Sequence, residues 1–280
     1  MAHTEFNWKS RDGYILYAQE WQPEGQVRAV VCLVHGLGEH SGRYGHVAQA
    51  LNGAGYALLS FDLRGHGRSE GPRGHTPSVE SWMEDIAQLL EQAAERFPGR
   101  PRFLYGHSLG GLLVLNYVLR RRPALAGVIA TGPALRSPLE GQTLKVAMAR
   151  LLGRLAPTLT MASGLPVEAL SHDSRVVQAY VSDPLVHDRA TARLAVETFS
   201  AARWALEHAA EFPRVPLLVM HGGADRICLP EGSRDFAAHV PGERMLKIWE
   251  GSYHEIHNEP DQAAVLGFLI DWLNGHVGVA

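Results

Sequence analysis

Short apolar runs that alternate with helix-like segments constrain this chain more than any other feature of its sequence. Residues 29–34 (Ala-Val-Val-Cys-Leu-Val) are apolar throughout, as expected of a strand buried on both faces. Similar runs recur at Tyr56–Phe61, Phe103–Tyr105, Val128–Ala130 and Pro216–Met220, and Met245–Trp249 is expected to supply the last strand. This alternation predicts an α/β fold, in which helices cover both faces of a largely parallel sheet.

Two further elements are expected outside these apolar runs, one strand near the start of the chain and one clear helix. Tyr14–Trp21 is expected to form an early strand that pairs with residues near Phe6. A helix is expected to start at Thr76-Pro77, because a capping residue precedes a proline suited to the first turn, and to continue to about Phe97. Pro98-Gly99 then ends it.

Residues 135–195 break the alternation, because their helix-like pieces have no buried strand between them. We therefore expect a single domain over residues 1–280 with a helical cap, or lid, inserted at 135–195. One apolar stripe in this insertion has helical spacing and consists of Leu144, Ala147, Met148, Leu151, Leu152 and Leu155. It indicates either a helix packed on the core or a lid that guides an apolar substrate or touches a membrane.

Length and composition agree with one domain, since 280 residues of which 46% are hydrophobic can bury a large core. The net charge of -3 favours no nucleic-acid partner. Residues 1–8 do not resemble a secretion signal, and no apolar stretch reaches the roughly 18 residues of a membrane span. Cys32 and Cys228 are too few for a disulfide framework. We expect a cytoplasmic protein, soluble or attached peripherally to a membrane.

Gly106-His-Ser-Leu-Gly110 places Ser108 between an expected strand and an expected helix. A sharp turn from a strand into a helix strains the middle residue, and the flanking glycines leave room for close packing. The hydroxyl of Ser108 would then project near the positive end of the helix, where a nucleophile can react. The alternative interpretation is an ordinary Gly-Ser turn, because pentapeptides of this kind recur by accident.

A serine nucleophile needs a base and an acid, which in this architecture follow it in the order acid, then histidine. Asp225 lies just after the run Pro216–Met220, and His254 follows Met245–Trp249. The alternative for Asp225 is a turn residue paired with Arg226, and His257 competes with His254 as the base. The spacing His-Glu-x-His differs from that of zinc-binding helices, so no metal is expected.

The developing oxyanion requires two backbone N–H donors. One is expected from Leu109, directly after the nucleophile, and the other from Leu37 in the loop His35-Gly-Leu-Gly38. The loop could equally be a tight turn that closes a strand, and both interpretations can hold together. The chain contains neither a P-loop nor a complete G-x-G-x-x-G, so no nucleotide cofactor is expected.

These segments resemble the monoglyceride lipase and lysophospholipase family of α/β-hydrolases. The similar blocks are residues 35–44 (His-Gly-Leu-Gly-Glu-His-Ser-Gly-Arg-Tyr), 61–69, 106–111, 180–185, 223–228 and 251–257 (Gly-Ser-Tyr-His-Glu-Ile-His). They cover nearly the whole expected core, and none lies between residues 135 and 176. The resemblance implies an α/β-hydrolase fold with the catalytic triad Ser108, Asp225 and His254.

The resemblance also assigns residues to the substrate. It implies that Glu39, Arg43, His257 and Tyr180 surround the glycerol end of a monoacylglycerol, which suits a polyol that needs convergent donors and acceptors. Glu39 and Arg43 could instead pair with each other and brace their loop. Cys228 matches a cysteine near the active site of some family members, and a buried packing thiol is the alternative.

The sequence therefore predicts a serine esterase that hydrolyses monoacylglycerols through an acyl-enzyme, with activity falling as His254 protonates near its ordinary pKa of about 6.5. Its partner would be a small lipid ester, and the cap could touch a membrane or micelle surface transiently. A lysophospholipase or broad carboxylesterase could use the same triad. A non-catalytic binding protein that keeps the hydrolase fold is a rival of another class.

Overall fold

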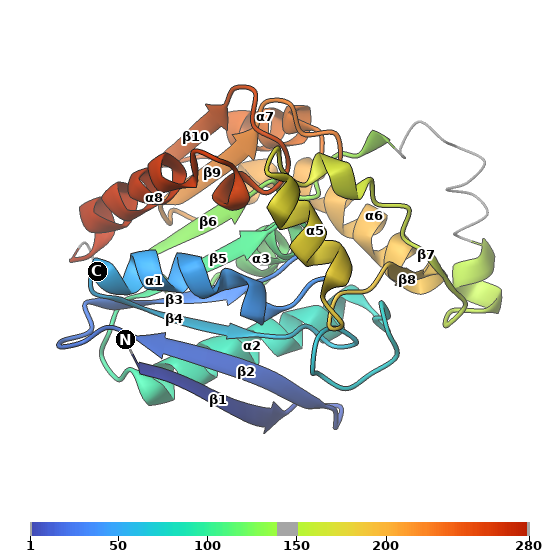
Figure 1. Ribbon diagram of the computed structural model, residues 1–280, viewed down its shortest axis with the longest axis horizontal. Coiled ribbons are helices and arrows are strands. Elements are labelled where there is room, and N and C mark those ends of the chain that lie inside the picture. Colours follow the sequence, from blue (N-terminus) through green and yellow to red (C-terminus); the bar gives the residue numbers. More distant parts are fainter. Residues whose placement is uncertain (1, 139–150, 279–280) are drawn as a thin grey trace.

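The computed structural model describes residues 2–138 and 151–278 and has an eight-stranded sheet at its centre (Figure 1). The strands lie in the order β1-β2-β4-β3-β5-β6-β9-β10. Their bounds are β1 Ala2–Lys9, β2 Ile15–Gln22, β3 Ala29–Val34, β4 Tyr56–Phe61, β5 Arg102–His107, β6 Gly127–Thr131, β9 Leu217–Gly222 and β10 Arg244–Trp249. From β4 to β10 in this order the strands are parallel, whereas β1–β2 and β2–β4 are antiparallel pairs. The predicted α/β fold is confirmed.

Alternation along the central strands creates two separate hydrophobic cores. In β3, Val30, Cys32 and Val34 face one cluster, while the residues between them face the other. All six residues of β3 are buried because helices cover both faces of the sheet. The continuous apolar runs that predicted the central strands follow directly from this two-sided burial.

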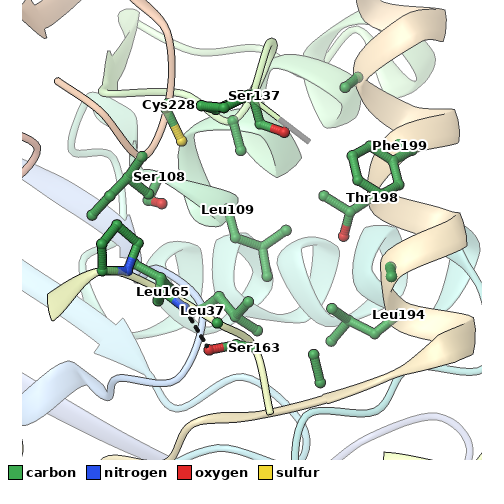
Figure 2. A pocket seen from close by; sticks show the side chains of 18 of the residues that line it. Leu37, Ser108, Leu109, Ser137, Ser163, Leu165, Leu194, Thr198, Phe199 and Cys228 are labelled. Atoms are coloured by element: carbon green, nitrogen blue, oxygen red, sulfur yellow. Dashed lines mark hydrogen bonds between the residues drawn. The ribbon is translucent and has the colours of Figure 1, made fainter. Parts of the chain in front are cut away.

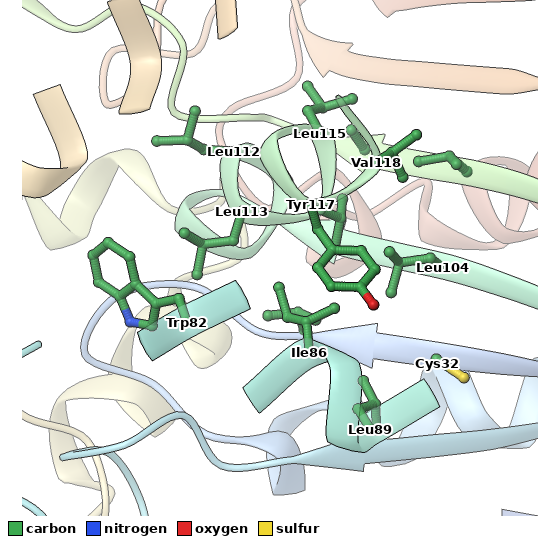
Figure 3. Packing of buried hydrophobic residues seen from close by; sticks show 14 of the residues in the cluster. Cys32, Trp82, Ile86, Leu89, Leu104, Leu112, Leu113, Leu115, Tyr117 and Val118 are labelled. Carbon is green, nitrogen blue, oxygen red and sulfur yellow. The ribbon is translucent and has the colours of Figure 1, made fainter. Parts of the chain in front are cut away.

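The helices divide between these two cores. The helices that lie wholly within the described residues are α1 Gly45–Gly53, α2 Val79–Arg96, α3 Leu109–Arg121, α5 Ser174–Ser182, α6 Ala192–Glu207, α7 Pro230–His239 and α8 Gln262–His276, with short 3₁₀ helices at Ser41–Tyr44, Val167–Ala169, Ala209–Glu211 and Ile256–Asn258. Residues 151–155 are helical as well. Buried residues of α2, α3, α6 and α7 belong to the cluster that contains Val30, Cys32 and Val34. Those of α1 and α8 belong to the cluster on the opposite face of the sheet. Figure 3 shows Trp82 and Ile86 of α2 packed beside Leu113 of α3 in the cluster that contains Cys32.

Helix α2 begins slightly later than its sequence suggests. Its N-cap is Ser78, which has an extended backbone and whose hydroxyl accepts a hydrogen bond from the N–H of Ser81 at 3.2 Å. Thr76 was the expected cap, but its hydroxyl instead donates to the carbonyl of Ser78 at 2.9 Å. Two capping residues occur in succession, and the one nearer the amphipathic segment satisfies the first-turn N–H.

The described part of residues 135–195 contains α5, the 3₁₀ helix Val167–Ala169 and a small antiparallel sheet of β7 (Thr160–Ala162) and β8 (Arg189–Thr191). In Figure 1, α5 and these strands lie beside the main sheet rather than within it. Of the expected apolar stripe, Leu144, Ala147 and Met148 lie outside the described residues. Leu152 is partly buried, whereas Leu151 and Leu155 are 57% and 75% exposed, so the described end of the stripe faces solvent at two of its three positions.

Within residues 2–138 and 151–278, no helix combines the length and the apolar character that crossing a bilayer requires.

Candidate active site

Ser108 occupies a strained turn between β5 and α3. Its φ is 55° and its ψ is -117°, a combination that costs a residue with a side chain about 1–3 kcal/mol. The flanking glycines make the turn sterically feasible: a Cβ at Gly106 would lie 2.2 Å from the carbonyl oxygen of Gly110, and one at Gly110 would lie 2.0 Å from that of Val34. The motif therefore folds as the strand–turn–helix context predicted, and not as an ordinary surface turn.

The structure brings Ser108, His254 and Asp225 into one hydrogen-bonded line. His254 Nε2 lies 2.9 Å from Ser108 Oγ, and His254 Nδ1 lies 2.6 Å from Asp225 Oδ2. The three side chains follow β5, β10 and β9, whose carboxyl ends share one edge of the sheet. This line can move a proton from the serine hydroxyl to the imidazole while the carboxylate stabilises the resulting cation.

The charges of this line favour that proton transfer. Burial alone would raise the pKa of Asp225, but the neighbouring His254 and His221 hold it well below its ordinary value. Burial alone would lower the pKa of His254, yet the ionised Asp225 beside it raises that pKa above 6.5. Asp225 therefore remains ionised, and His254 is a stronger base than an isolated imidazole.

Asp225 has a further partner that the sequence did not reveal. His221 Nε2 lies 3.0 Å from Asp225 Oδ2, the same oxygen that binds His254. The other oxygen, Oδ1, accepts from the backbone N–H groups of Ile227 at 2.8 Å and Cys228 at 3.0 Å. His221 lies near the end of β9, and no spacing rule marks a histidine at the end of a strand as a partner of the acid.

The two expected oxyanion donors lie near Ser108. Neither the N–H of Leu37 nor that of Leu109 has a hydrogen-bond acceptor within residues 2–138 and 151–278. The loop is held by Gly36, whose N–H donates to Glu39 Oε1 at 2.6 Å. A Cβ at Gly36 would lie 3.1 Å from the Cβ of Ser108, so glycine permits the loop to approach the serine.

A cavity of about 370 Å³ opens on one side of Ser108 (Figure 2). Its walls are mostly apolar and include Leu37, Leu109, Ala134, Leu165, Pro166, Ala190, Leu194, Ala195, Thr198, Phe199, Ala202, Ile227 and Cys228. Cys228 lines this cavity together with Ser108, and burial raises the pKa of its thiol far above the ordinary value. The cavity can hold a flexible hydrocarbon, and the protonated Cys228 serves as part of its wall.

A much smaller polar recess, of about 10 Å³, lies on the other side of Ser108. Its walls are Gly36, Leu37, Glu39, His107, Ser108, Leu165, Leu170, Tyr180, His254 and Glu255. About one water molecule fits in a space of this size. Unlike the apolar cavity, the recess is bordered by buried charges.

Arg43 joins two buried carboxylates at this recess. Its Nη1 lies 2.6 Å from Glu39 Oε2 and 2.6 Å from Glu255 Oε1, and its Nη2 lies 2.8 Å from Glu255 Oε2. Although burial opposes it, Arg43 lowers the pKa of Glu39 to about 2. The sequence suggested a Glu39–Arg43 pair. It gave no sign that Glu255 also pairs with Arg43, because that contact spans 212 residues of sequence.

Tyr180 and His257 occupy different positions relative to the recess. Tyr180 lines it, and its ring lies 4.7 Å from the guanidinium carbon of Arg43. His257 is only 1% exposed and lines neither this recess nor the apolar cavity. Its ring contacts those of Tyr44, His46 and His107, and its Nδ1 has no hydrogen-bond partner among the residues described.

His107 connects the recess to this layer of rings. It lies between His254 and His257, with ring centroids 4.9 and 4.7 Å away. Burial, together with the charge of His254, lowers the pKa of His107 to about 4, so His107 is neutral at physiological pH. In the described part of the chain, no group of three His, Cys, Asp or Glu side chains is arranged to hold a metal ion.

Comparison with known proteins identifies the family. A family model described as serine aminopeptidase, S33, matches residues 25–261, which is most of the chain. The chain belongs to this family. The S33 assignment covers all the strands from β3 to β10 and each residue of the Ser108–His254–Asp225 line.

Curated relatives and solved structures place the chain more narrowly within the S33 family. It is 37% identical to a monoacylglycerol lipase of Mycolicibacterium smegmatis over 99% of both chains. It superimposes on the crystal structure of a Paleococcus ferrophilus monoacylglycerol lipase with a TM-score of 0.86 and 39% identity, covering 93% of this chain and 99% of that one. An uncharacterized abhydrolase domain-containing protein of Dictyostelium discoideum is 36% identical over 99% of this chain, which spans 30% of that protein's length. The predicted membership of the monoglyceride lipase family and the α/β-hydrolase fold are confirmed.

Proposed function

We propose that this protein is a serine hydrolase that cleaves monoacylglycerols into glycerol and a fatty acid. The observation that carries this proposal is the position of Ser108, hydrogen-bonded to His254 and flanked by an apolar cavity on one side and a polar recess on the other. A monoacylglycerol has the same polarity, with a long acyl chain on one side of its ester bond and a compact polyol on the other. The lipase relatives from Mycolicibacterium and Paleococcus support the same assignment.

In the first step, Ser108 Oγ attacks the ester carbonyl and its proton passes to His254 Nε2. Since Asp225 accepts only hydrogen bonds, Nδ1 of His254 carries the proton between them and Nε2 is free to act as the base. The carbonyl oxygen becomes an oxyanion, to which the N–H groups of Leu37 and Leu109 donate. The proton on His254 then moves to the departing glycerol oxygen, leaving an acyl-serine.

In the second step, His254 takes a proton from water, and the hydroxide formed attacks the acyl-serine carbonyl. The same two N–H groups stabilise the second oxyanion, and its collapse releases the fatty acid as the proton returns to Ser108 Oγ. Asp225 remains ionised throughout, because its partners hold its pKa below the ordinary value. No cofactor is needed for either step.

We propose that Glu39, Arg43 and Tyr180 recognise the glycerol end, with His257 acting one layer behind through His107. Glycerol needs more space than the roughly 10 Å³ of the recess. Leu165, Leu170 and Tyr180 line it, and all three belong to residues 135–195. We therefore propose that this segment is a cap whose outward shift enlarges the recess when substrate enters.

The cap also offers a surface for lipid aggregates. Leu151 and Leu155 lie four residues apart in a helical segment and are 57% and 75% exposed, and Val181 of α5 is 64% exposed. We propose that these side chains touch a membrane or micelle surface transiently while the substrate transfers into the cavity. A cytoplasmic location is part of this proposal, which the two buried free thiols, Cys32 and Cys228, support.

The primary test is labelling of Ser108 by a fluorophosphonate, combined with hydrolysis of a 1-monoacylglycerol. We expect one label per chain and release of glycerol and fatty acid in equal amounts. A Ser108→Ala variant is the matched control and should neither react with the probe nor turn over. Ordinary turnover by that variant would contradict the proposal, as would an unlabelled wild-type serine, which is the result expected of a non-catalytic binding protein.

A lysophospholipase or broad carboxylesterase would use the same residues on another leaving group. The small recess is bordered by Glu39 and Glu255, whose charges are paired with Arg43, and it therefore favours a compact neutral alcohol over a bulky choline head group. Rates on 1-monoacylglycerol, lysophosphatidylcholine and a short p-nitrophenyl ester of matched concentration decide between them. Equal kcat/KM on all three would show that the recess does not select glycerol.

A further inference from the structure

Asp225 binds two imidazoles rather than one. His254 Nδ1 and His221 Nε2 lie 2.6 and 3.0 Å from the same oxygen, Oδ2. The side chains of His221 and Asp225 are both fully buried, so no solvent competes for these bonds. Only His254 is used in the reaction steps above, which leaves His221 as a buried histidine directly on the acid with no assigned role.

The neighbours of His221 determine where its proton resides. Its Nε2 faces Asp225 Oδ2 and, at 2.9 Å, the carbonyl oxygen of Cys228, and both of these can only accept. Nε2 must therefore carry a hydrogen. Its Nδ1 lies 2.6 Å from Ser233 Oγ, which can donate a hydroxyl hydrogen to it. The tautomer with its hydrogen on Nε2 thus satisfies both ring nitrogens, because the Ser233 hydroxyl can donate to Nδ1.

His221 also completes the set of donors around the carboxylate. Oδ1 of Asp225 accepts from the N–H groups of Ile227 and Cys228, while Oδ2 accepts from the two imidazoles. Four donors on two oxygens fix the plane of the carboxylate, since rotation about its bond to Cβ would break bonds on both sides. Because His221 additionally binds the Cys228 carbonyl, it closes the turn that carries Asp225.

Ser233 connects this arrangement to helix α7. It is fully buried in that helix, which packs against β9 and β10, the strands that precede Asp225 and His254. His221 itself lies within β9. The contact between Ser233 and His221 therefore relates the acid to the packing of α7 on the sheet, and not only to its own loop.

We propose that His221, held by Ser233, is a positioning residue for the catalytic acid. A buried chain then runs from Ser233 through His221, Asp225 and His254 to Ser108. His221 keeps the carboxylate aimed at His254 and shares the negative charge of Oδ2 while the imidazolium forms. It touches neither substrate nor the reacting atoms. This inference rests on the proposed function, because it concerns the same Ser108–His254–Asp225 machinery.

The decisive variant is His221→Leu, which removes the donor at similar volume. We expect kcat per fluorophosphonate-titrated site to fall about 10- to 100-fold with KM nearly unchanged, as for other buried partners that orient a functional group. Without His221, the negative charge of Oδ2 stabilises only the His254 imidazolium and raises the pKa of His254. The acid limb of kcat should therefore move to higher pH. The other groups facing His254, namely His107, Glu39 and Glu255, are unchanged, so a displaced limb reports Asp225.

Two further variants separate positioning from packing. His221→Gln keeps an N–H donor and should restore most of the rate and the wild-type acid limb. Ser233→Ala removes only the bond to Nδ1 of His221, so we expect a smaller loss, about fivefold in kcat, equivalent to one neutral hydrogen bond. His276→Leu is the matched control, because His276 is another buried histidine bound through both ring nitrogens, to Trp272 and Glu243, in helix α8. It should leave kcat and the limb unchanged.

The outcomes separate this inference from the proposed function. An unchanged kcat and acid limb in titrated His221→Leu would overturn the inference while leaving the hydrolase intact. If that variant does not fold, Ser233→Ala decides alone: a reduced kcat with a displaced limb supports the pair, and wild-type values refute it. Failure of wild-type Ser108 to react with the probe would instead contradict the proposed function, whatever the His221 variants show.

Discussion

The two spaces beside Ser108 differ in both volume and polarity. On one side, a cavity of about 370 Å³ is lined mostly by apolar side chains, several of them small residues of helix α6. On the other, a recess of about 10 Å³ is bordered by Glu39 and Glu255, which both pair with Arg43. Leu37, Ser108 and Leu165 line both spaces and so mark the boundary between them.

This difference indicates how each side can discriminate between substrates. An apolar cavity rejects a ligand mainly by volume, and one methylene more or less changes the free energy of binding by only about 1–3 kcal/mol. Fixed buried charges tolerate much less, since a group that leaves one of them unpaired incurs a large desolvation cost. We expect the acyl side to accept a range of chain lengths and the polar side to be selective and sensitive to mutation.

Removal of the Ser108 hydroxyl, where the two spaces meet, should have the largest effect on kcat and a small effect on substrate binding. In Ser108→Ala, kcat should fall by about five orders of magnitude or more, because no nucleophile remains for His254 to activate. Both spaces keep their other walls, so a nonhydrolysable ether analogue of monoacylglycerol should bind with nearly the wild-type Kd by calorimetry. A large loss of affinity would mean that the two spaces are not independent of the nucleophile.

Removal of the positive charge of Arg43, which pairs with the two carboxylates of the polar recess, should have the largest effect on the free energy of unfolding. Arg43→Met leaves Glu39 and Glu255 buried without their shared cation, and we expect the free energy of unfolding to drop by about 3–5 kcal/mol in urea titrations. Arg136→Met is the control, since its pair with Asp235 is half-exposed and should contribute at most about 1 kcal/mol. Equal losses in the two variants would contradict the view that the polar side is a rigid charged network.

The sequence predicted the strands and the catalytic residues well, but it predicted the walls of the two spaces beside Ser108 poorly. The buried strands were predictable because two-sided burial imposes continuous apolar runs, and the positions of Ser108, Asp225 and His254 followed from the strands that precede them. The contacts of Glu255 with Arg43 could not be predicted, because they join residues 212 positions apart and depend on how two loops approach in space.

His257 shows a second limit of sequence reasoning. The resemblance assigned it to the glycerol end, yet its ring lies behind His107 and is 1% exposed. A motif gives the identity and spacing of residues, but which of two nearby imidazoles lines a space depends on side-chain packing. The small volume of the recess likewise depends on Leu165 and Leu170, which come from the part of the chain between residues 135 and 176 that holds no block similar to the family.

A change in volume on the apolar side should alter chain-length preference with little loss of stability. Ala195 lines the cavity from helix α6, so Ala195→Phe should reduce the space available to long acyl chains. We expect the ratio of kcat/KM for a 16-carbon over a 4-carbon 1-monoacylglycerol to fall about tenfold, since each lost methylene contact removes about 0.8 kcal/mol. Ser200→Phe, at an exposed position of the same helix, should leave the ratio unchanged. A falling rate on the short ester would show that the substitution damages the catalytic line instead.

The smallest expected effect is electrostatic and distinguishes the two sides without changing the shape of either. Asp225 raises the pKa of His254, and Glu255 and Glu39 raise it further, so the acid limb of kcat should have its midpoint above pH 6.5 in the wild type. His254 must be neutral to accept the serine proton, so any change that lowers its pKa extends activity to lower pH. Glu39→Gln should therefore move the limb to lower pH, whereas Thr198→Val, a nearly isosteric change on the apolar side, should not move it. If both variants displaced the limb equally in pH–rate profiles, the charges of the polar side would not be acting on His254 specifically, and the division between the two sides would be one of size alone.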